Sequence, residues 1–390
     1  MPCISRQKPT DTVTRFRLGW VGVGILLGGW TAAGTPSYKI QVRESGVYRV
    51  TGDDLVRTGT FRAGIRSDRL GLRNSGQPVP IWIEDGGDGT FDPGDSIEFV
   101  GRRLAGKRGH LNEFSEYNVY RLETDGGSRM RMDTPALGGN CRAQPGQVRR
   151  VHLERDRLRV RFSTHAGADQ EVWFWHRMSP LETHPVAIDL PIQDVDATSP
   201  ALLRGHFRGW SRPPRKNSQA DHQVELVLNG RRLGFTDWDN DVDGFLFEAA
   251  LRPSALRSGP NRLELRVPRR VETGGSRAAV DVVLLNWIEV LYRRRPFTPV
   301  EPILLEPTTD DCLAFEAGSE ARLLLYDEAG GRVSLDVPRG GRGLIKWRPE
   351  GSIWVVPRGA WRSPAAITVD RPSDLRARGH EADYLILSHS

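Results

Sequence analysis

The sequence contains few cysteines and few lysines, and both shortages narrow its possible functions. Only 3 of the 390 residues are cysteine, which excludes a disulfide framework and a cysteine-rich metal site. Of the 55 basic residues 5 are lysine, which leaves 55 − 5 = 50 arginines, spread along the chain among 49 acidic residues. Proteins that bind nucleic acid gather their basic residues on one face. The net charge of +6 therefore does not indicate a nucleic-acid partner.

The sequence also lacks the short motifs of common catalytic sites. It has no Gly-x-Ser-x-Gly elbow, no His-Glu-x-x-His zinc motif, no Walker loop and no dinucleotide fingerprint. Long helical periodicity is absent too, and short apolar runs are instead punctuated by 42 glycines and 26 prolines. We therefore expect a mostly β fold made of several small antiparallel domains.

The N-terminus has the order of a secretory signal peptide. Basic residues come first, an apolar stretch follows over 18–30, and small residues lead to Gly34. A membrane span needs about 20 apolar residues, and this stretch is shorter. We expect a signal peptide over 1–34, no stable membrane span after cleavage, and export to the periplasm, the cell surface or the medium; an uncleaved anchor is the alternative.

Two polar, aperiodic stretches divide the remaining chain into three β domains. We expect an N-terminal β domain over 35–140, a jelly-roll-like β-sandwich over 151–296 and a small β domain over 303–377. The sandwich is predicted from evenly spaced strands without helices. Its clearest local signal is Asn229-Gly230 between two alternating runs, because this pair favours a two-residue hairpin turn.

One acidic loop, "EDGGDGTFDPGD", offers a candidate calcium site. Its carboxylates are Asp85, Asp88, Asp92 and Asp95, and hard oxygen donors are what Ca²⁺ prefers. Their spacing does not match an EF-hand. Asp-Gly pairs are also typical of tight turns, which is the interpretation that we favour. Calcium is the only cofactor that the sequence suggests.

Tryptophans in the predicted sandwich offer a candidate carbohydrate site. Trp173 and Trp175 lie in the strongly β-forming run "EVWFW", and exposed aromatic rings of this kind stack on sugars. Tryptophan in a β-sandwich more often packs in the core or at its rim. Carbohydrate binding therefore remains an alternative.

Cys312 is a poor candidate for a catalytic nucleophile. It follows Asp310 and Asp311, and neighbouring carboxylates raise the pKa of a thiol, whereas a catalytic cysteine needs a lowered pKa. Cys141 and Cys312 could form one disulfide in an oxidising compartment, but no spacing pattern supports the pairing.

Four stretches together resemble the region upstream of the peptidase domain in gingipain-like secreted cysteine peptidases. They are "YKIQVRESGVYRVTGDDL", "NSGQPVPIWIEDGGDGTFDPGDSIEFVG" with "YNVYRL", the sandwich from "HQVELVLNGRRLG" to "VVLLNWIEVLYRR", and the terminal "ADYLILSHS". The second and the last are the more specific. The resemblance implies that 378–390 is the first strand of a caspase-like α/β peptidase domain that is missing here.

The resemblance implies a non-catalytic chain. The catalytic His and Cys of the family lie downstream of that strand, so neither has a counterpart in this sequence, and His389 is not a candidate for the catalytic His. We expect a pro- or accessory region that shields or positions a peptidase domain, with that domain or a cell-surface component as partner. The alternative is an extracellular carbohydrate- or calcium-binding β-sandwich.

Overall fold

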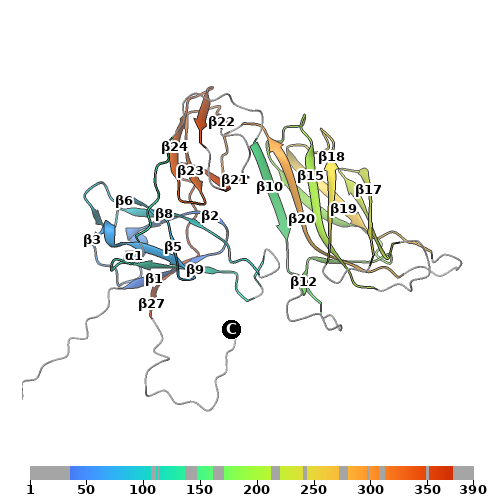
Figure 1. Ribbon diagram of the computed structural model, residues 1–390, viewed down its shortest axis with the longest axis horizontal. Helices are drawn as coiled ribbons and strands as arrows, with labels where there is room; N and C mark the ends of the chain where they lie inside the picture. Colours follow the sequence, from blue (N-terminus) through green and yellow to red (C-terminus); the bar gives the residue numbers. More distant parts are fainter. Residues whose placement is uncertain are drawn as a thin grey trace, which may run out of the picture. The chain divides into compact units, whose positions relative to one another are not determined.

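The computed structural model describes residues 36–106, 111–112, 114–127, 129–136, 147–160, 171–211, 220–239, 244–271, 280–296, 298–306, 312–347 and 351–371. All of them belong to one compact unit, Pro36–Ser390, and their regular structure is almost entirely β-strand (Figure 1). The expected mostly β fold class is confirmed. The expected signal peptide over 1–34 and the expected strand within 378–390 lie outside the described residues. None of the helices in the described ranges has the length and hydrophobicity that a membrane span requires.

The first β domain, residues 36–136, contains a sheet of order β27-β1-β9-β4-β5 and a sheet of order β2-β8-β6. Tyr38, Ile40 and Val42 of β1 are fully buried, because alternate side chains of a strand point to the same face. The strands are β1 (Ser37–Val42), β2 (Gly46–Thr51), β3 (Ile65–Arg66), β4 (Gly71–Asn74), β5 (Gln77–Val79), β6 (Trp82–Glu84), β7 (Thr90–Phe91), β8 (Ser96–Gly101) and β9 (Asn118–Glu123), with helix α1 (Gly52–Val56) and a 3-10 turn (Ser67–Arg69).

The sandwich, residues 147–294, consists of two main antiparallel sheets that share one core. One has the order β10-β20-β15-β18, with β13 also pairing with β20, and the other has the order β14-β19-β16-β17. The strands are β10 (Gln147–Glu154), β11 (Leu158–Arg159), β12 (Trp173–Phe174), β13 (His176–Met178), β14 (Val186–Ile192), β15 (Ala201–Gly209), β16 (His222–Leu228), β17 (Arg231–Trp238), β18 (Phe245–Leu251), β19 (Gly259–Arg266) and β20 (Val283–Arg294).

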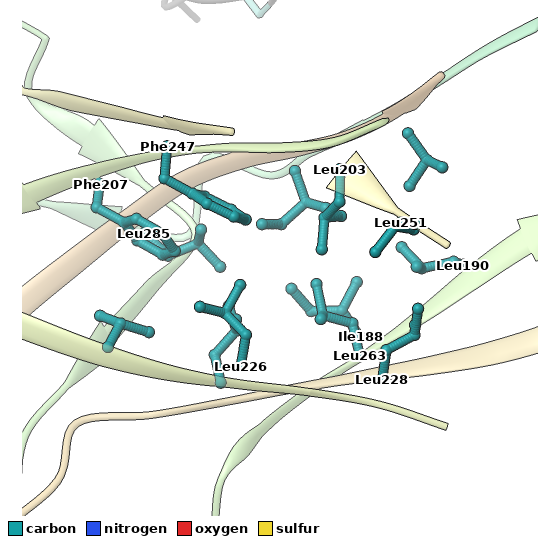
Figure 2. Packing of buried hydrophobic residues seen from close by; sticks show 14 of the residues in the cluster. Ile188, Leu190, Leu203, Phe207, Leu226, Leu228, Phe247, Leu251, Leu263 and Leu285 are labelled. Atoms are coloured by element: carbon teal, nitrogen blue, oxygen red, sulfur yellow. The ribbon is translucent and has the colours of Figure 1, made fainter. Parts of the chain in front are cut away.

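Side chains from both main sheets meet in the sandwich core (Figure 2). Leu203 and Phe207 of β15 point toward Leu226 of β16 and Leu263 of β19, and all four are at most 3% exposed. Burying a leucine or phenylalanine side chain stabilises a fold by about 1.5–3 kcal/mol. The core is thus the main source of stability for this part of the chain.

The third β domain, residues 303–357, contains a sheet of order β21-β26-β23-β24 and the pair β22-β25. Its own apolar core includes Phe315, Leu325 and Val355, all fully buried. The strands are β21 (Ile303–Leu305), β22 (Cys312–Glu316), β23 (Ala321–Asp327), β24 (Arg332–Val337), β25 (Arg342–Lys346) and β26 (Ile353–Pro357).

The strand after the third domain returns to the first domain. The third domain was expected to extend to residue 377, but β27 (Ala366–Asp370) pairs antiparallel with β1, from Gln41↔Ala366 to Ser37↔Asp370. Ile367 and Val369 pack against the core of the first domain. The first domain is therefore completed by residues that are more than 300 positions away in sequence.

The predicted Asn229-Gly230 turn joins β16 to β17, with φ of 51° and 78°. Ser75 and Gly76 join β4 to β5 in the same way, with φ of 48° and 81°. A type I′ turn needs positive φ at both central residues, which asparagine and glycine tolerate best.

Gly209 at the end of β15 is required by close packing. A Cβ atom there would lie 2.0 Å from Nε2 of His222, whose imidazole is fully buried. The His222 imidazole cannot move away from the added atom, because its Nδ1 lies 2.8 Å from Oδ1 of the buried Asp281. Asp281 is itself held by a hydrogen bond from Arg270. This His-Asp pair resembles part of a catalytic triad, but the contact with Gly209 leaves no room for a substrate.

We predict that Gly209→Ala destabilises the protein by about 1–3 kcal/mol or more, the usual cost of forcing an extra methyl group into a packed site. Urea unfolding measures this change. Gly318→Ala is the control, because a Cβ at Gly318 meets nothing within 4 Å. Equal unfolding midpoints for the two variants would contradict the packing argument.

Candidate functional site

The first and third β domains are joined by a shared apolar cluster. Val47 of β2 and Met132 pack together with Leu324, Trp354 and Val356 of the third domain, and all are buried. A buried cluster contributed by two domains stabilises their association in the same way as a domain core stabilises a fold.

A buried carboxylate lies at the centre of this junction. Glu98 of β8 is 1% exposed, and its Oε2 accepts hydrogen bonds from the Tyr326 hydroxyl at 2.7 Å and from Nε of Arg332 at 2.9 Å. Trp361 Nε1 donates to the Tyr326 oxygen at 3.1 Å. Glu98 belongs to the first domain and both of its donors to the third, so the carboxylate is satisfied only when the two domains are docked.

Two arginine side chains of the junction pack over tryptophan rings. The guanidinium of Arg332 lies 4.2 Å from the centre of the Trp82 ring, and that of Arg49 lies 4.6 Å from the Trp361 ring. Arg332 also pairs with Glu84 at 3.6 Å. Arginine suits such a place because its planar group can stack and form an ion pair at once.

Burial and charge at the junction shift two pKa values. Burial, followed by the negative charge of Glu98, raises the pKa of Tyr326 far above its usual value of 10.0, so the phenol remains a hydrogen-bond donor. For Arg332 burial is the largest influence and acts to lower the pKa, but the charges and hydrogen bonds of Glu98 and Tyr326 together outweigh it, so the pKa is raised. Arg332 therefore stays charged across the physiological pH range.

Backbone hydrogen bonds cross the same junction. The Asp133 N–H donates to the Gly330 carbonyl at 3.1 Å, and the Arg332 N–H donates to the Asp133 carbonyl at 2.8 Å. On the other side, the Arg362 N–H donates to the Val47 carbonyl at 2.8 Å. The two domains thus share an apolar core, a buried ion pair and short stretches of backbone pairing.

A cavity of about 340 Å³ lies beside the junction. It is lined by the β4–β5 hairpin, the start of the β23–β24 turn and the ion pair between Arg102 and Glu328, whose nearest N–O distance is 3.3 Å. Pro78 and Pro80 on its wall contribute no N–H group, which disfavours the addition of a further strand to β5.

The sandwich carries a second polar cluster on the outer side of β10, β20, β15 and β18. Glu248, Arg204, Glu289 and His152 lie side by side on these strands. Arg204 contacts Glu248 at 2.7 Å and Glu289 at 3.7 Å, and His152 contacts Glu289 at 3.4 Å and Glu154 at 3.0 Å. Alternating charges on neighbouring strands stabilise a sheet.

Burial lowers the pKa of His152, but hydrogen bonds and charges from Glu154 and Glu289 outweigh it and raise the pKa above 6.5. His152 also packs at 5.3 Å from the Trp287 ring, and His206 stacks on the same tryptophan at 5.8 Å. With two imidazoles against it, Trp287 is poorly placed to stack on a sugar.

Three of the four aspartates of the candidate calcium loop accept hydrogen bonds within local turns, and the fourth, Asp92, accepts at its Oδ1 from the Gly64 N–H at 2.8 Å. Asp85 Oδ1 accepts from the Gly87 N–H at 3.0 Å, Asp88 Oδ1 from the Thr90 N–H at 2.8 Å, and Asp95 Oδ2 from the Asp92 N–H at 2.6 Å. The hydrogen bonds from Thr90 lower the pKa of Asp88. No group of three or more His, Cys, Asp or Glu residues suited to a metal occurs in the described ranges.

The two tryptophans of the candidate carbohydrate site are not an exposed pair. Trp175 is 8% exposed and belongs to the sandwich core, while Trp173 of β12 is half-buried. The faces of the Trp175 ring are therefore unavailable for stacking on a sugar, and core packing, the alternative named above, describes this residue.

Cys312 is bonded in a disulfide, and its partner lies outside the described residues. A disulfide sulfur is not a thiolate, so Cys312 cannot act as a nucleophile in this form. This agrees with its rejection on sequence grounds.

The junction residues were missed by sequence reasoning because their partners are distant. Glu98 is separated by 228 residues from Tyr326 and by 234 from Arg332. The one local signal was a glutamate inside the apolar run Ile97–Val100, because a charge within a buried strand requires a partner.

Comparisons with known proteins bear on the fold of most of the chain. No family model and no curated protein matches it. A solved structure, "Crystal structure of dimeric latent PorU from Porphyromonas gingivalis", matches with a TM-score of 0.60 and 14% identity over 86% of this chain and 33% of that chain. This likeness shows a shared fold, and the chain spans only 33% of the length of PorU.

Other solved structures are much less similar. The cycloalternan-forming enzyme from Listeria monocytogenes matches with a TM-score of 0.23 and 8% identity over 66% of this chain and 19% of that chain. The beta-glucuronidase from Bifidobacterium dentium matches with a TM-score of 0.17 and 13% identity over 44% and 33%. These scores are too low to indicate a common architecture.

We predict that Glu98→Gln destabilises the protein by up to about 3–5 kcal/mol, because it leaves the buried Arg332 charge with the exposed and more distant Glu84 carboxylate, at 3.6 Å, in place of Glu98. Tyr326→Phe should cost less, about 1–2 kcal/mol, because Arg332 still satisfies Glu98. Urea unfolding followed by tryptophan fluorescence measures the change. Asp336→Asn, which breaks an exposed ion pair with Arg322, is the control and should cost less than about 1 kcal/mol. A cost for Glu98→Gln no larger than that of the control would refute the role of the buried pair.

We predict that His152 makes stability depend on pH. Its pKa is raised on folding, so its contribution is complete below the unfolded value of about 6.5 and is lost as the pH rises through the higher folded value. Urea midpoints between pH 5.5 and 8.5 should therefore fall more steeply in the wild type than in His152→Gln. Exposed His184→Gln is the control and should keep the wild-type slope; identical slopes for wild type and His152→Gln would exclude this role.

Proposed function

We propose that this chain is the non-catalytic N-terminal region of a secreted gingipain-like cysteine peptidase, where its β domains shield or position a caspase-like peptidase domain. One observation carries the proposal: 86% of the chain shares its fold with 33% of PorU. The other 100 − 33 = 67% of that protein leaves room for further domains. The PorU structure is described as latent, and a withheld activity is what a shielding region would produce.

The sequence resemblance and the junction coincide. The stretch "NSGQPVPIWIEDGGDGTFDPGDSIEFVG", one of the two more specific parts of the resemblance, contains Trp82, Glu84 and Glu98. These residues contact Arg332 of the third domain. The part of the chain that most resembles the family thus also holds the first domain against the third, as a scaffold for another domain requires.

The disulfide at Cys312 supports both a non-catalytic role and export. It occupies a sulfur that a cysteine peptidase would need as a thiolate. Disulfides also persist in secreted and periplasmic proteins, whereas the cytosol keeps thiols reduced. Together with the signal-like N-terminus, this favours the periplasm, the cell surface or the medium.

The proposal predicts binding in trans to a caspase-like peptidase domain. The full chain, titrated into a separately expressed gingipain-like peptidase domain, should bind with a micromolar or lower Kd and reduce turnover or stabilise the domain against heat. Calorimetry, a chromogenic substrate assay and thermal unfolding measure these effects. Neither binding nor any change in turnover or thermal stability would overturn the proposal.

The chain alone should not hydrolyse peptides. A panel of substrates with Arg, Lys or an apolar residue at P1, tested with and without reductant, should give no turnover above buffer. Thiol-dependent turnover that is lost in Cys312→Ala would contradict the proposal. A parallel calcium titration and a glycan array test the alternative binding functions; a saturable signal lost in Asp88→Ala or Trp173→Ala would favour them.

A further inference from the structure

A second cavity, of about 300 Å³, lies where the sandwich meets the segment leading to β21. Its lining includes Arg294 at the end of β20, Asp194 and Ser258 of the sandwich, and Thr298 and Glu301 of that segment. Cavities of this size that lie between domains commonly bind small ligands or single side chains.

A buried cation lines this cavity. Arg294 is 1% exposed, its NH1 donates to Gln147 Oε1 at 3.2 Å, and its NH2 lies 3.3 Å from Oδ2 of Asp194. The Asp194 side chain is 31% exposed, so part of its charge is screened by water. Burial outweighs this pairing and lowers the pKa of Arg294, so a further anion beside the guanidinium would stabilise its charged form.

An unsatisfied hydroxyl lines the same cavity. Thr298 is 9% exposed and its N–H donates to the Glu316 carbonyl, but its Oγ1 has no hydrogen-bond partner among the described residues. Buried hydroxyl groups in proteins almost always have a partner. Ser258 Oγ accepts from the Val195 N–H at 3.1 Å, which leaves the hydroxyl hydrogen of Ser258 for another acceptor.

The remaining walls limit the ligand to a monoanion with an apolar body. Pro299, Val300 and Ile303 supply apolar surface, and Val300 is 86% exposed. Asp194 and Glu301 also line the cavity and would repel a doubly charged anion such as phosphate. A carboxylate carries a single negative charge, and the Arg294 guanidinium and the hydroxyls of Thr298 and Ser258 are suitable donors for its two oxygens.

We propose that this cavity binds a carboxylate carried by a short aliphatic group, with Arg294 and the Thr298 hydroxyl contacting the carboxylate oxygens and Val300 and Ile303 the aliphatic part. Two sources share this chemistry, a free short-chain carboxylic acid and the C-terminal residue of a peptide. The proposal is independent of the peptidase assignment, because it concerns residues of this chain alone.

Calorimetry on the full chain tests the proposal with three probes: isovalerate, acetyl-Ala-Val with a free carboxylate, and the same peptide as its amide. At least one carboxylate should bind, and the free peptide should bind at least about tenfold more tightly than its amide if the peptide C-terminus is the source. Binding of isovalerate without the peptide identifies a free acid as the source. Equal binding of acid and amide, or no binding of either carboxylate, would overturn the proposal.

Two variants with opposite expected effects test the site. Arg294 is left unchanged in both, because the hydrogen bond from Arg294 to Gln147 also supports the fold. Thr298→Val should weaken carboxylate binding by about three- to tenfold, the usual effect of one lost hydrogen bond. Glu301→Gln should strengthen binding by about twofold or more, because it removes a repelling charge. Exposed Thr368→Val and Glu320→Gln are the matched controls and should bind as the wild type. Unchanged affinity in both test variants would also overturn the proposal.

Discussion

The arrangement of the first and third β domains depends on one buried carboxylate. A lone ionised carboxylate inside a protein is destabilised by several kcal/mol, because it loses its hydration without compensation. Among the described residues, the donors that satisfy Glu98 are the Tyr326 hydroxyl and the Arg332 guanidinium, which both come from the third domain. The first domain alone would expose or leave unsatisfied a charge that its own strand β8 places in the interior. The first domain therefore requires the third domain, which supplies the hydrogen-bond donors for Glu98.

Several of the many arginines of the chain form stabilising contacts inside the structure. Arg332 and Arg49 stack on tryptophans at the junction, Arg204 bridges two glutamates on the sandwich, and Arg294 is buried between strands. Lysine could not replace them without loss, because its point charge neither stacks on rings nor forms planar paired hydrogen bonds. The basic composition thus reflects internal pairing in these places.

The sequence predicted the features that depend on neighbouring residues. The alternation of β16 and the Asn229-Gly230 turn are local, so the hairpin could be read directly from the chain. The role of Glu98 could not, because its partners are more than 200 residues away. Pairing of β27 with β1 was missed for the same reason, and the apolar pattern of "AITVD" fits either domain. Trp175 shows a different limit: the pattern predicted a strand but not which face of it would be covered.

Because β27 pairs with β1, the described part of the chain ends beside the first domain. Asp370, its last residue, is held by Lys39 at 3.1 Å and by Arg121 at 3.0 Å, both on neighbouring strands of the first domain. The chain thus leaves the described structure from the sheet of the first domain, although the preceding strands belong to the third. If the proposed peptidase domain follows, it is tethered to β1 and β27, while the buried Glu98 pair fixes the third domain against the same first domain. A shield assembled in this way needs both domains, since loss of the junction would free the third domain while leaving the tether in place.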